Sequence, residues 1–334
     1  MQLKRKNLWL ATCLLTLPMT VAMAEDAPKS VNEQLVDTLT TLSGGPHAGQ
    51  RSNHAKGVLA TGEFTPSASA ASLTKAAHLQ AKSTPVVVRF SNATGVPNIP
   101  DANGNAFPKG MAIRFQLPDG AISDMVCISV NGFPAATPED FLGLLKAIAA
   151  SGPEAAKPTP VEQFLGSHPD ALAFVKTPKL PPVSFATQPF FGVNAFKFTN
   201  AKGETQFGRY RIEPIAGAQF LSAEAADKAS PNYLMDELPV RLSKSAVKYR
   251  ISVQLADAGD VINDPTVVWP DTRKVVELGV LTLNAMHANG EAFAKGTMFN
   301  PLALVDGIEA SDDPILLARP GAYAVSFGRR LQSQ

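Results

Sequence analysis

Short apolar runs recur along the chain from residue 84 onward, and most of them contain β-branched or alternating apolar residues. Such runs, separated by segments rich in Gly, Asn and Pro, are typical of half-buried strands. The pattern predicts strands at 84–91, 111–117, 123–130, 192–200, 208–215, 246–256 and 274–283.

Apolar residues at helical spacing occupy other stretches of the chain. Residues 137–151 begin with Thr137 as a cap, Pro138 in the first turn and two acidic residues, which together predict a helix start. Further helices are expected within 25–45, at about 161–175, within 222–238 and at the C-terminal end. The strands are spread over both halves of the chain without a charged or low-complexity linker. The pattern therefore predicts an α+β fold, with one domain over 25–334 built around an antiparallel barrel or sandwich.

The first residues have the composition of a targeting segment. A basic stretch at 4–6 precedes an apolar run at 8–17, and residues 22–24, Ala-Met-Ala, match a small-x-small cleavage site. The run is too short to span a bilayer comfortably, so residues 1–24 are predicted to be a cleaved signal peptide. We expect export to the periplasm and no insertion into the membrane.

The net charge and the cysteine content exclude several classes of function and of stabilising bond. Removing residues 1–24 takes away three of the 30 basic residues and none of the 29 acidic residues, which leaves a net charge of −2. This balance argues against a nucleic-acid partner. Cys127 is then the single remaining cysteine, so no internal disulfide is expected. The five histidines show no zinc-type spacing, and no nucleophile elbow or phosphate loop occurs.

The C-terminal segment RPGAYAVSFGRR carries the strongest chemical signal. On a helix, Arg319 and Tyr323 lie one turn apart on the same face, and Arg330 follows two turns later. A free tyrosine has a pKa near 10, but a neighbouring guanidinium favours the phenolate form. A phenolate is a strong ligand for ferric haem iron, and arginines pair with carboxylates such as haem propionates.

Several segments, in order along residues 45–330, resemble the catalase superfamily, in particular its short branch of catalase-related haem peroxidases. The resemblance rests on RSNHAKG at 51–57, TPVVVRFS at 84–91, GMAIRF at 110–115, and RPGAY followed by SFGRR near the C-terminus. SFATQPFFGVNAFKFTN, RYRIEPIAG and QLADAGDVINDPTVVWPD add to it. It implies a haem-binding antiparallel β-barrel with flanking helices.

The resemblance also implies roles for individual residues. It makes His54 the distal acid–base residue and Ser91 the residue that orients it. Tyr323 becomes the axial ligand of the haem iron, with Arg319 as its partner. The remaining cofactor-binding residues are the propionate partners and a phenylalanine that faces the haem: Arg51, Arg89, Arg330 and Phe141. Because no C-x-x-C-H motif is present for covalent attachment, the cofactor is expected to be haem b.

The chain departs from large catalases at three places. The position of the catalytic asparagine is occupied by Ile128, and Asn131 does not align with it. An acidic residue that lines the access channel is replaced by Phe107. The chain ends shortly after Arg330 and lacks the long C-terminal region of large catalases.

These observations predict a haem peroxidase that reduces hydrogen peroxide, or organic peroxides, with a small organic donor, has weak catalase activity and serves in peroxide defence. Two alternatives stay open at this stage. One is an enzyme of the same fold that rearranges lipid hydroperoxides, and the other is a haem carrier without catalytic activity. The donor and the choice between monomer and homodimer are also open.

Overall fold

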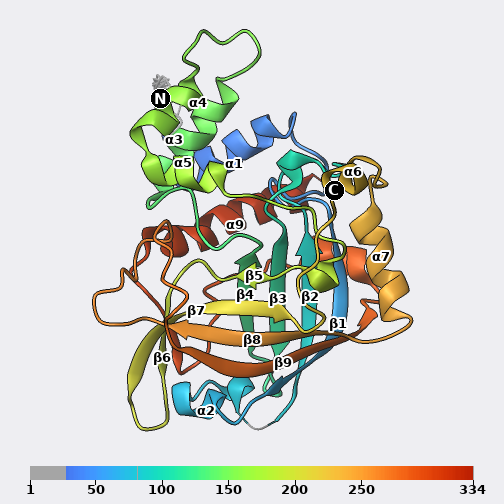
Figure 1. Cartoon of the computed structure of the whole chain (residues 1–334), viewed down its shortest axis with the longest axis vertical. Helices are drawn as coiled ribbons and strands as arrows, with labels where there is room; N and C mark the ends of the chain where they lie inside the picture. Colours follow the sequence, from blue (N-terminus) through green and yellow to red (C-terminus); the bar gives the residue numbers. More distant parts are fainter. Residues whose placement is uncertain (1–27, 81, 334) are drawn as a thin grey trace, which may run out of the picture.

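The computed structural model describes residues 28–80 and 82–333, so the predicted signal peptide lies outside the described residues. A closed antiparallel β-barrel forms the centre of the structure, because β7 and β8, which are separated in the order of the sheet, also pair with each other (Figure 1). The barrel strands, in chain order, are β1 Gly57–Pro66, β2 Thr84–Ser91, β3 Gly110–Gln116, β4 Ile122–Ile128, β5 Phe190–Phe191, β7 Thr205–Pro214, β8 Val247–Leu255 and β9 Val275–Met286.

Two short strands, β6 Phe196–Thr199 and β10 Ile308–Ala310, extend the sheet beyond β7. The helices flank the barrel: α1 Val31–Leu42, α2 Ala70–Leu73, α3 Pro138–Ala149, α4 Pro160–Ser167, α5 Pro169–Lys176, α6 Ala223–Asp227, α7 Tyr233–Leu242, α8 Gly290–Gly296 and α9 Pro314–Gln332. Short 3₁₀ turns occur at η1 Ala77–Leu79, η2 Gly104–Ala106 and η3 Phe185–Thr187.

The structure confirms the expected α+β class. Its closed sheet is a barrel, one of the two architectures expected from the sequence, and not a sandwich. Alternate residues of β2, Val86, Val88 and Phe90, point into the barrel core. The intervening residues Arg89 and Ser91 face a pocket outside it. The two-residue period of a strand thus separates the residues that stabilise the fold from those available for chemistry.

Strand β1 was not predicted, because Gly57, Gly62 and Pro66 interrupt its apolar pattern. It is nevertheless a central strand, paired with β2 on one side and β9 on the other. Gly62 sits at a bulge in this pairing, and a Cβ atom there would lie 1.9 Å from the carbonyl oxygen of Thr282. The close approach of the β9 backbone therefore requires a glycine at this position.

The predicted helices are present with two corrections. The helical segment expected within 222–238 is two helices, α6 and α7, and α7 continues to Leu242. The helix expected at about 161–175 is two helices, α4 and α5, because Pro169 begins a new helix directly after His168. Helix α3 has the predicted Thr137 cap, whose side chain accepts a hydrogen bond from the Asp140 backbone N–H. No helix within residues 28–80 and 82–333 is long and apolar enough to cross a membrane.

Helix α9 positions the site, because it runs between the barrel and the helical layer formed by α1, α3, α4 and α5 (Figure 1). Asp313 caps its first turn by accepting hydrogen bonds from the backbone N–H groups of Ile315 and Leu316. Apolar residues of α1 and α3, including Leu35, Leu142 and Leu145, pack together next to it. The helix therefore presents one long face to the outer surface of the barrel.

Candidate active site

One pocket lies between the outer face of strands β2–β4 and helix α9, with α1 and α3 forming a further wall. All eight residues singled out in the sequence line it: Arg51, His54, Arg89, Ser91, Phe141, Arg319, Tyr323 and Arg330. Their individual roles stay predictions, but the structure brings together residues that are far apart in the chain.

His54 stands on the barrel side of this pocket in an unusual backbone conformation, with a φ of 55°. Its carbonyl oxygen accepts a hydrogen bond from Nη2 of Arg89 at 2.9 Å, and its N–H donates to Oδ1 of Asn53 at 3.0 Å. The imidazole Nδ1 lies 3.1 Å from Oγ of Ser91. Backbone and ring of His54 are thus held by three separate side chains.

The environment of His54 keeps its imidazole neutral. Burial, which has the largest effect, and the charges of Arg89, Arg51 and Arg319 together lower its pKa to about 3. A neutral imidazole has one nitrogen that accepts a proton. Because Nδ1 is engaged with Ser91, Nε2 is the nitrogen left for proton transfer.

Gly110 makes room for the imidazole. A Cβ atom at this position would lie 2.8 Å from Nδ1 of His54 and 2.7 Å from Oγ of Ser91. Gly110 pairs with Ser91 on β2 and with Ile128 on β4, so the three residues form one row across the sheet. Ile128 also lines the pocket and brings no hydrogen-bonding group to it. Asn131 is not among the residues that line this pocket.

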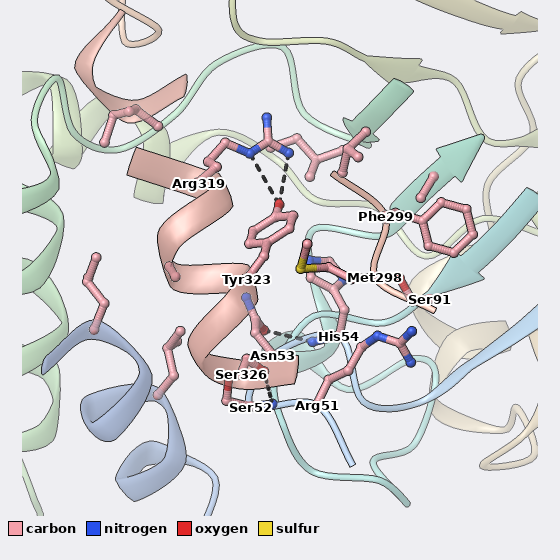
Figure 2. A pocket seen from close by; sticks show the side chains of 18 of the residues that line it. Arg51, Ser52, Asn53, His54, Ser91, Met298, Phe299, Arg319, Tyr323 and Ser326 are labelled. Atoms are coloured by element: carbon pink, nitrogen blue, oxygen red, sulfur yellow. Dashed lines mark hydrogen bonds between the residues drawn. The ribbon is translucent and has the colours of Figure 1, made fainter. Parts of the chain in front are cut away.

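Tyr323 on α9 lies across the pocket from the barrel, and its phenol oxygen is held by Arg319 (Figure 2). Arg319 donates to this oxygen from Nη2 at 2.9 Å and from Nε at 3.2 Å. Its Nη1 donates to Oδ1 of Asn194 at 2.7 Å, and Nδ2 of Asn194 donates to Asp313 at 2.7 Å. These two donors hold the phenol oxygen in one position and would stabilise negative charge on it if it bound a metal ion.

Three further arginines enter the pocket without a carboxylate partner among the described residues: Arg51, Arg89 and Arg330. Arg51 and Arg330 each donate to the carbonyl oxygen of Thr297 at 3.0 Å. The Nε atoms of Arg89 and Arg330 are buried without a hydrogen-bond partner. Burial lowers the pKa of all three, and repulsion within the group lowers those of Arg51 and Arg89 further. Such a cluster fits a ligand with more than one negative charge.

The loop that carries His54 is also tied to the helix that carries Tyr323. Oγ of Ser52 donates to Oγ of Ser326 at 2.9 Å, one turn after Tyr323 on α9. The two sides of the pocket are therefore linked directly as well as through the pocket walls. On the α3 side Phe141 packs against Phe133 at a ring-centroid distance of 4.9 Å, and both line the pocket.

Sequence reasoning did not find four residues that hold the site: Ser52, Asn53, Gly110 and Asn194. Asn53 and Ser52 lie within the segment around His54, but only their contacts in three dimensions reveal what they bind. Asn194 lies 125 positions from Arg319 in the chain, so no local pattern could have linked the two.

Comparison with known proteins places this site in a family. The family model described as Catalase matches residues 32–333. The chain belongs to the catalase family. A protein named Catalase-related peroxidase from Synechococcus elongatus is 34% identical over 328 residues, which cover 96% of each chain. A protein of the same name from Mycolicibacterium paratuberculosis is 35% identical over 301 residues, or 89% of this chain and 94% of that one.

Larger members of the catalase family match over only part of their length. A catalase from Alkalihalophilus pseudofirmus is 29% identical over 298 residues, which cover 82% of this chain and 43% of that protein. The crystal structure of a fungal catalase superposes with a TM-score of 0.75 at 24% identity, covering 89% of this chain and 62% of that chain. At this identity the likeness describes the fold.

Membership of the catalase family implies a haem-type cofactor, and the residues of the pocket fit one. Tyr323 offers a phenol oxygen already bound by a guanidinium, which suits ligation of ferric iron. Arg51, Arg89 and Arg330 offer positive charge that no described carboxylate neutralises, which suits two propionates. The apolar residues between these groups suit the faces of a porphyrin.

Proposed function

We propose that the protein is a haem-dependent peroxidase that reduces hydrogen peroxide, or an organic peroxide, with electrons from a small organic donor. The observation that carries the proposal is that one pocket holds both a fixed, neutral imidazole at His54 and a guanidinium-bound phenol at Tyr323. The two relatives named Catalase-related peroxidase, similar over nearly the whole chain, support the same assignment.

The cofactor is proposed to be haem b, with Tyr323 as the iron ligand and Arg51, Arg89 and Arg330 as partners of the propionates. When bound, the haem would supply the redox chemistry, in which the peroxide takes up two electrons that the organic donor then replaces. Arg319 orients the Tyr323 oxygen by donating two hydrogen bonds to it, and its positive charge would stabilise this oxygen as an iron ligand. Asn194 in turn holds the third guanidinium nitrogen.

His54 moves the proton that cleavage of the peroxide requires. Nε2 takes the proton from one oxygen of hydrogen peroxide and returns it to the other oxygen, which leaves as water. This exchange needs an imidazole that is neutral at the start, and the low pKa of His54 meets that need. Ser91 and Arg89 fix the ring and the backbone, so the imidazole does not have to reorganise during the transfer.

The positioning of His54 also favours an enzyme over a haem carrier. A carrier requires an iron ligand and partners for the propionates, but it has no need for an acid–base group. Here Ser91, Arg89 and Asn53 all bind His54, and Gly110 leaves the space for its ring. That many contacts to one non-ligating residue support a catalytic role for it.

Export is part of the proposal as well. The basic and apolar composition of residues 1–24, together with the Ala-Met-Ala site, supports a cleaved signal peptide ahead of the catalytic domain at 25–334. The enzyme would then remove peroxide in the periplasm. N-terminal sequencing of the protein from a periplasmic extract tests this, because the account predicts a mature chain that begins at Glu25.

Steady-state assays of the purified, haem-loaded protein test the function. With hydrogen peroxide and a phenolic dye the account predicts oxidation of the dye well above that by free haem, and slow release of dioxygen without the dye. Haem uptake without either activity would support the carrier instead. Conversion of a lipid hydroperoxide without any donor would support the rearranging enzyme.

A further inference from the structure

Asn53, which directly precedes His54, is held in one orientation by two backbone groups. Its Oδ1 accepts a hydrogen bond from the N–H of His54 at 3.0 Å and from the N–H of Thr94 at 2.7 Å. His54 and Thr94 are the two non-glycine residues with positive φ in the described part of the chain, at 55° and 74°. The side chain of Asn53 thus joins two residues in the left-handed conformation, of which His54 lines the pocket.

This arrangement decides which end of the amide faces the pocket. Because both partners of Oδ1 are N–H donors, the acceptor end of the amide has to be the one that meets them. The other end is Nδ2, which has no hydrogen-bond partner among the residues that the structure describes. Asn53 lines the pocket, and Figure 2 shows its amide beside His54, with the nitrogen turned away from the His54 backbone and toward Tyr323.

We propose that Nδ2 of Asn53 donates a hydrogen bond to the peroxide held next to His54. The inference rests on the proposed function, because it assigns a second binding group for the same substrate. An amide does not titrate, so it remains a donor while His54 changes its protonation state. A fixed donor beside the oxygen that loses its proton stabilises the negative charge that develops there.

On the barrel side of the pocket, the side chains of β3 and β4 offer no such donor. The outward residues of β4 that line the pocket, Val126 and Ile128, are apolar, and Ala112 on β3 has no polar group. Ser91 is engaged with Nδ1 of His54. Asn53 is therefore the neutral amide in position to orient a small hydrogen-bond acceptor beside the imidazole.

Two substitutions separate this donor role from the positioning role of Oδ1. Asn53→Asp removes the donor but keeps an oxygen for the N–H groups of His54 and Thr94, and it adds a negative charge. Asn53→Ala removes the donor without adding charge, and it also removes the acceptor. The same two changes at Asn131, an asparagine that does not line the pocket, serve as matched controls.

The primary readout is equilibrium binding of fluoride to the ferric, haem-loaded protein, followed by absorption, since fluoride accepts hydrogen bonds and undergoes no turnover. Loss of one hydrogen bond predicts roughly tenfold weaker fluoride binding for both Asn53 variants and no change for the Asn131 variants. The Michaelis constant for hydrogen peroxide should rise by a similar factor. Thermal unfolding of the apoproteins should show a lower midpoint for Asn53→Ala than for Asn53→Asp.

Each other pattern overturns the inference. Weaker binding in Asn53→Ala alone would show that the residue only positions the backbone. Weaker binding in Asn53→Asp alone would show an effect of charge, and unchanged binding in both would exclude any donor role. Failure of the proposed function itself would appear differently, as a natural protein that does not take up haem or does not oxidise donors with peroxide.

Discussion

Asn194 accepts a hydrogen bond at 2.7 Å from Nη1 of Arg319, whose other two nitrogens both bind the phenol oxygen of Tyr323. Asn194 is itself bound to Asp313, the residue that caps α9. The chain of contacts from the helix cap to the phenol therefore fixes the orientation of the guanidinium. Because this orientation points two donors at the phenol oxygen, we expect it to contribute to the proposed affinity for ferric haem.

Asn194→Ala should weaken haem binding by about three- to tenfold, the net effect of losing one ordinary hydrogen bond, because Asn194 acts on the ligand only through Arg319. Competition for haem between the apoprotein and a second haem-binding protein measures the change. Asn105→Ala, at an exposed position, is the control and should bind haem normally. Equal affinity in Asn194→Ala and the natural protein would mean that Arg319 does not need this support.

His54→Ala should leave haem bound but slow the reaction with hydrogen peroxide by roughly 10²–10⁴-fold, the usual contribution of a positioned proton-transfer group. Rapid mixing with peroxide, followed by absorption, gives this rate. His168→Ala, outside the pocket, should react at the natural rate. If His54→Ala also reacted at that rate, another group would have to be the base.

The low pKa of His54 sets the pH dependence of this step. Since its pKa is lowered to about 3, the imidazole stays neutral at every pH above that value. The rate of reaction with peroxide in the natural protein should therefore be flat between about pH 5 and 8 and fall only in more acidic solution. A midpoint near the ordinary histidine value of about 6.5 would contradict the burial of His54 seen here.

We expect Ile128 to favour peroxidase turnover over catalase turnover. Release of dioxygen requires a second hydrogen peroxide to be held beside His54 and oxidised there, and the β4 side of the pocket offers it no hydrogen bond. Ile128→Asn should raise dioxygen release relative to dye oxidation by about tenfold, because a donor there would help to orient the peroxide. Parallel oxygen-electrode and dye assays give the ratio, with Ile128→Val as the apolar control.

Two outcomes would contradict the role given to Ile128. The first is a dioxygen rate for the natural protein close to that of a large catalase assayed alongside. The second is an Ile128→Asn variant that binds haem normally and keeps the natural ratio of the two activities. Either result would show that the apolar side chain of Ile128 does not limit the rate at which a second hydrogen peroxide is oxidised.

The sequence predicted the parts of this structure that depend on local pattern. The β-branched apolar residues of β2 predicted the strand, whereas the structure showed that Arg89 and Ser91 share its outward face. The apolar pattern did not predict β1, because glycines interrupt it. Gly62 is required there by the close approach of the β9 backbone and not by the strand itself. A glycine of that kind is recognised only after the neighbouring strand is known.

In the candidate site, too, local contacts could be predicted from the sequence and long-range contacts could not. The i, i+4 spacing of Arg319 and Tyr323 on a helix was readable from the sequence and corresponds to a real contact. Asn194 and Gly110 were not readable, because their roles come from contacts across the fold with Arg319 and His54. Residues that hold a site through long-range contacts leave no periodic trace in the chain.

We expect His78 to make the free energy of unfolding depend on pH. It is buried in η1 with Nδ1 lacking a hydrogen-bond partner, and burial lowers its pKa to about 4. The unfolded chain therefore binds more protons at this residue between about pH 4 and 6.5, and stability is lost as the pH falls through that range. The shift in the pKa of His78 corresponds to a loss of about 3 kcal/mol in the free energy of unfolding once the pH is below both pKa values.

His78→Leu should remove most of this dependence. Denaturant unfolding of the natural apoprotein and the variant at pH 7 and pH 4.5 measures the free energy of unfolding at each pH. The variant should lose less stability than the natural protein between the two pH values. The same loss in both proteins would show that His78 takes up its proton without unfolding.

The absorption spectrum of ferric haem in Tyr323→Phe tests the account most directly, because every proposed step depends on ligation by the Tyr323 oxygen. Tyr233→Phe is the matched control, since Tyr233 donates to the carbonyl oxygen of Pro182 and does not line the pocket. The account predicts that the control keeps the natural spectrum and one haem per chain, whereas Tyr323→Phe retains haem poorly and shows a changed spectrum. Full haem occupancy with an unchanged spectrum in Tyr323→Phe would contradict the assignment of the iron ligand and the mechanism built on it.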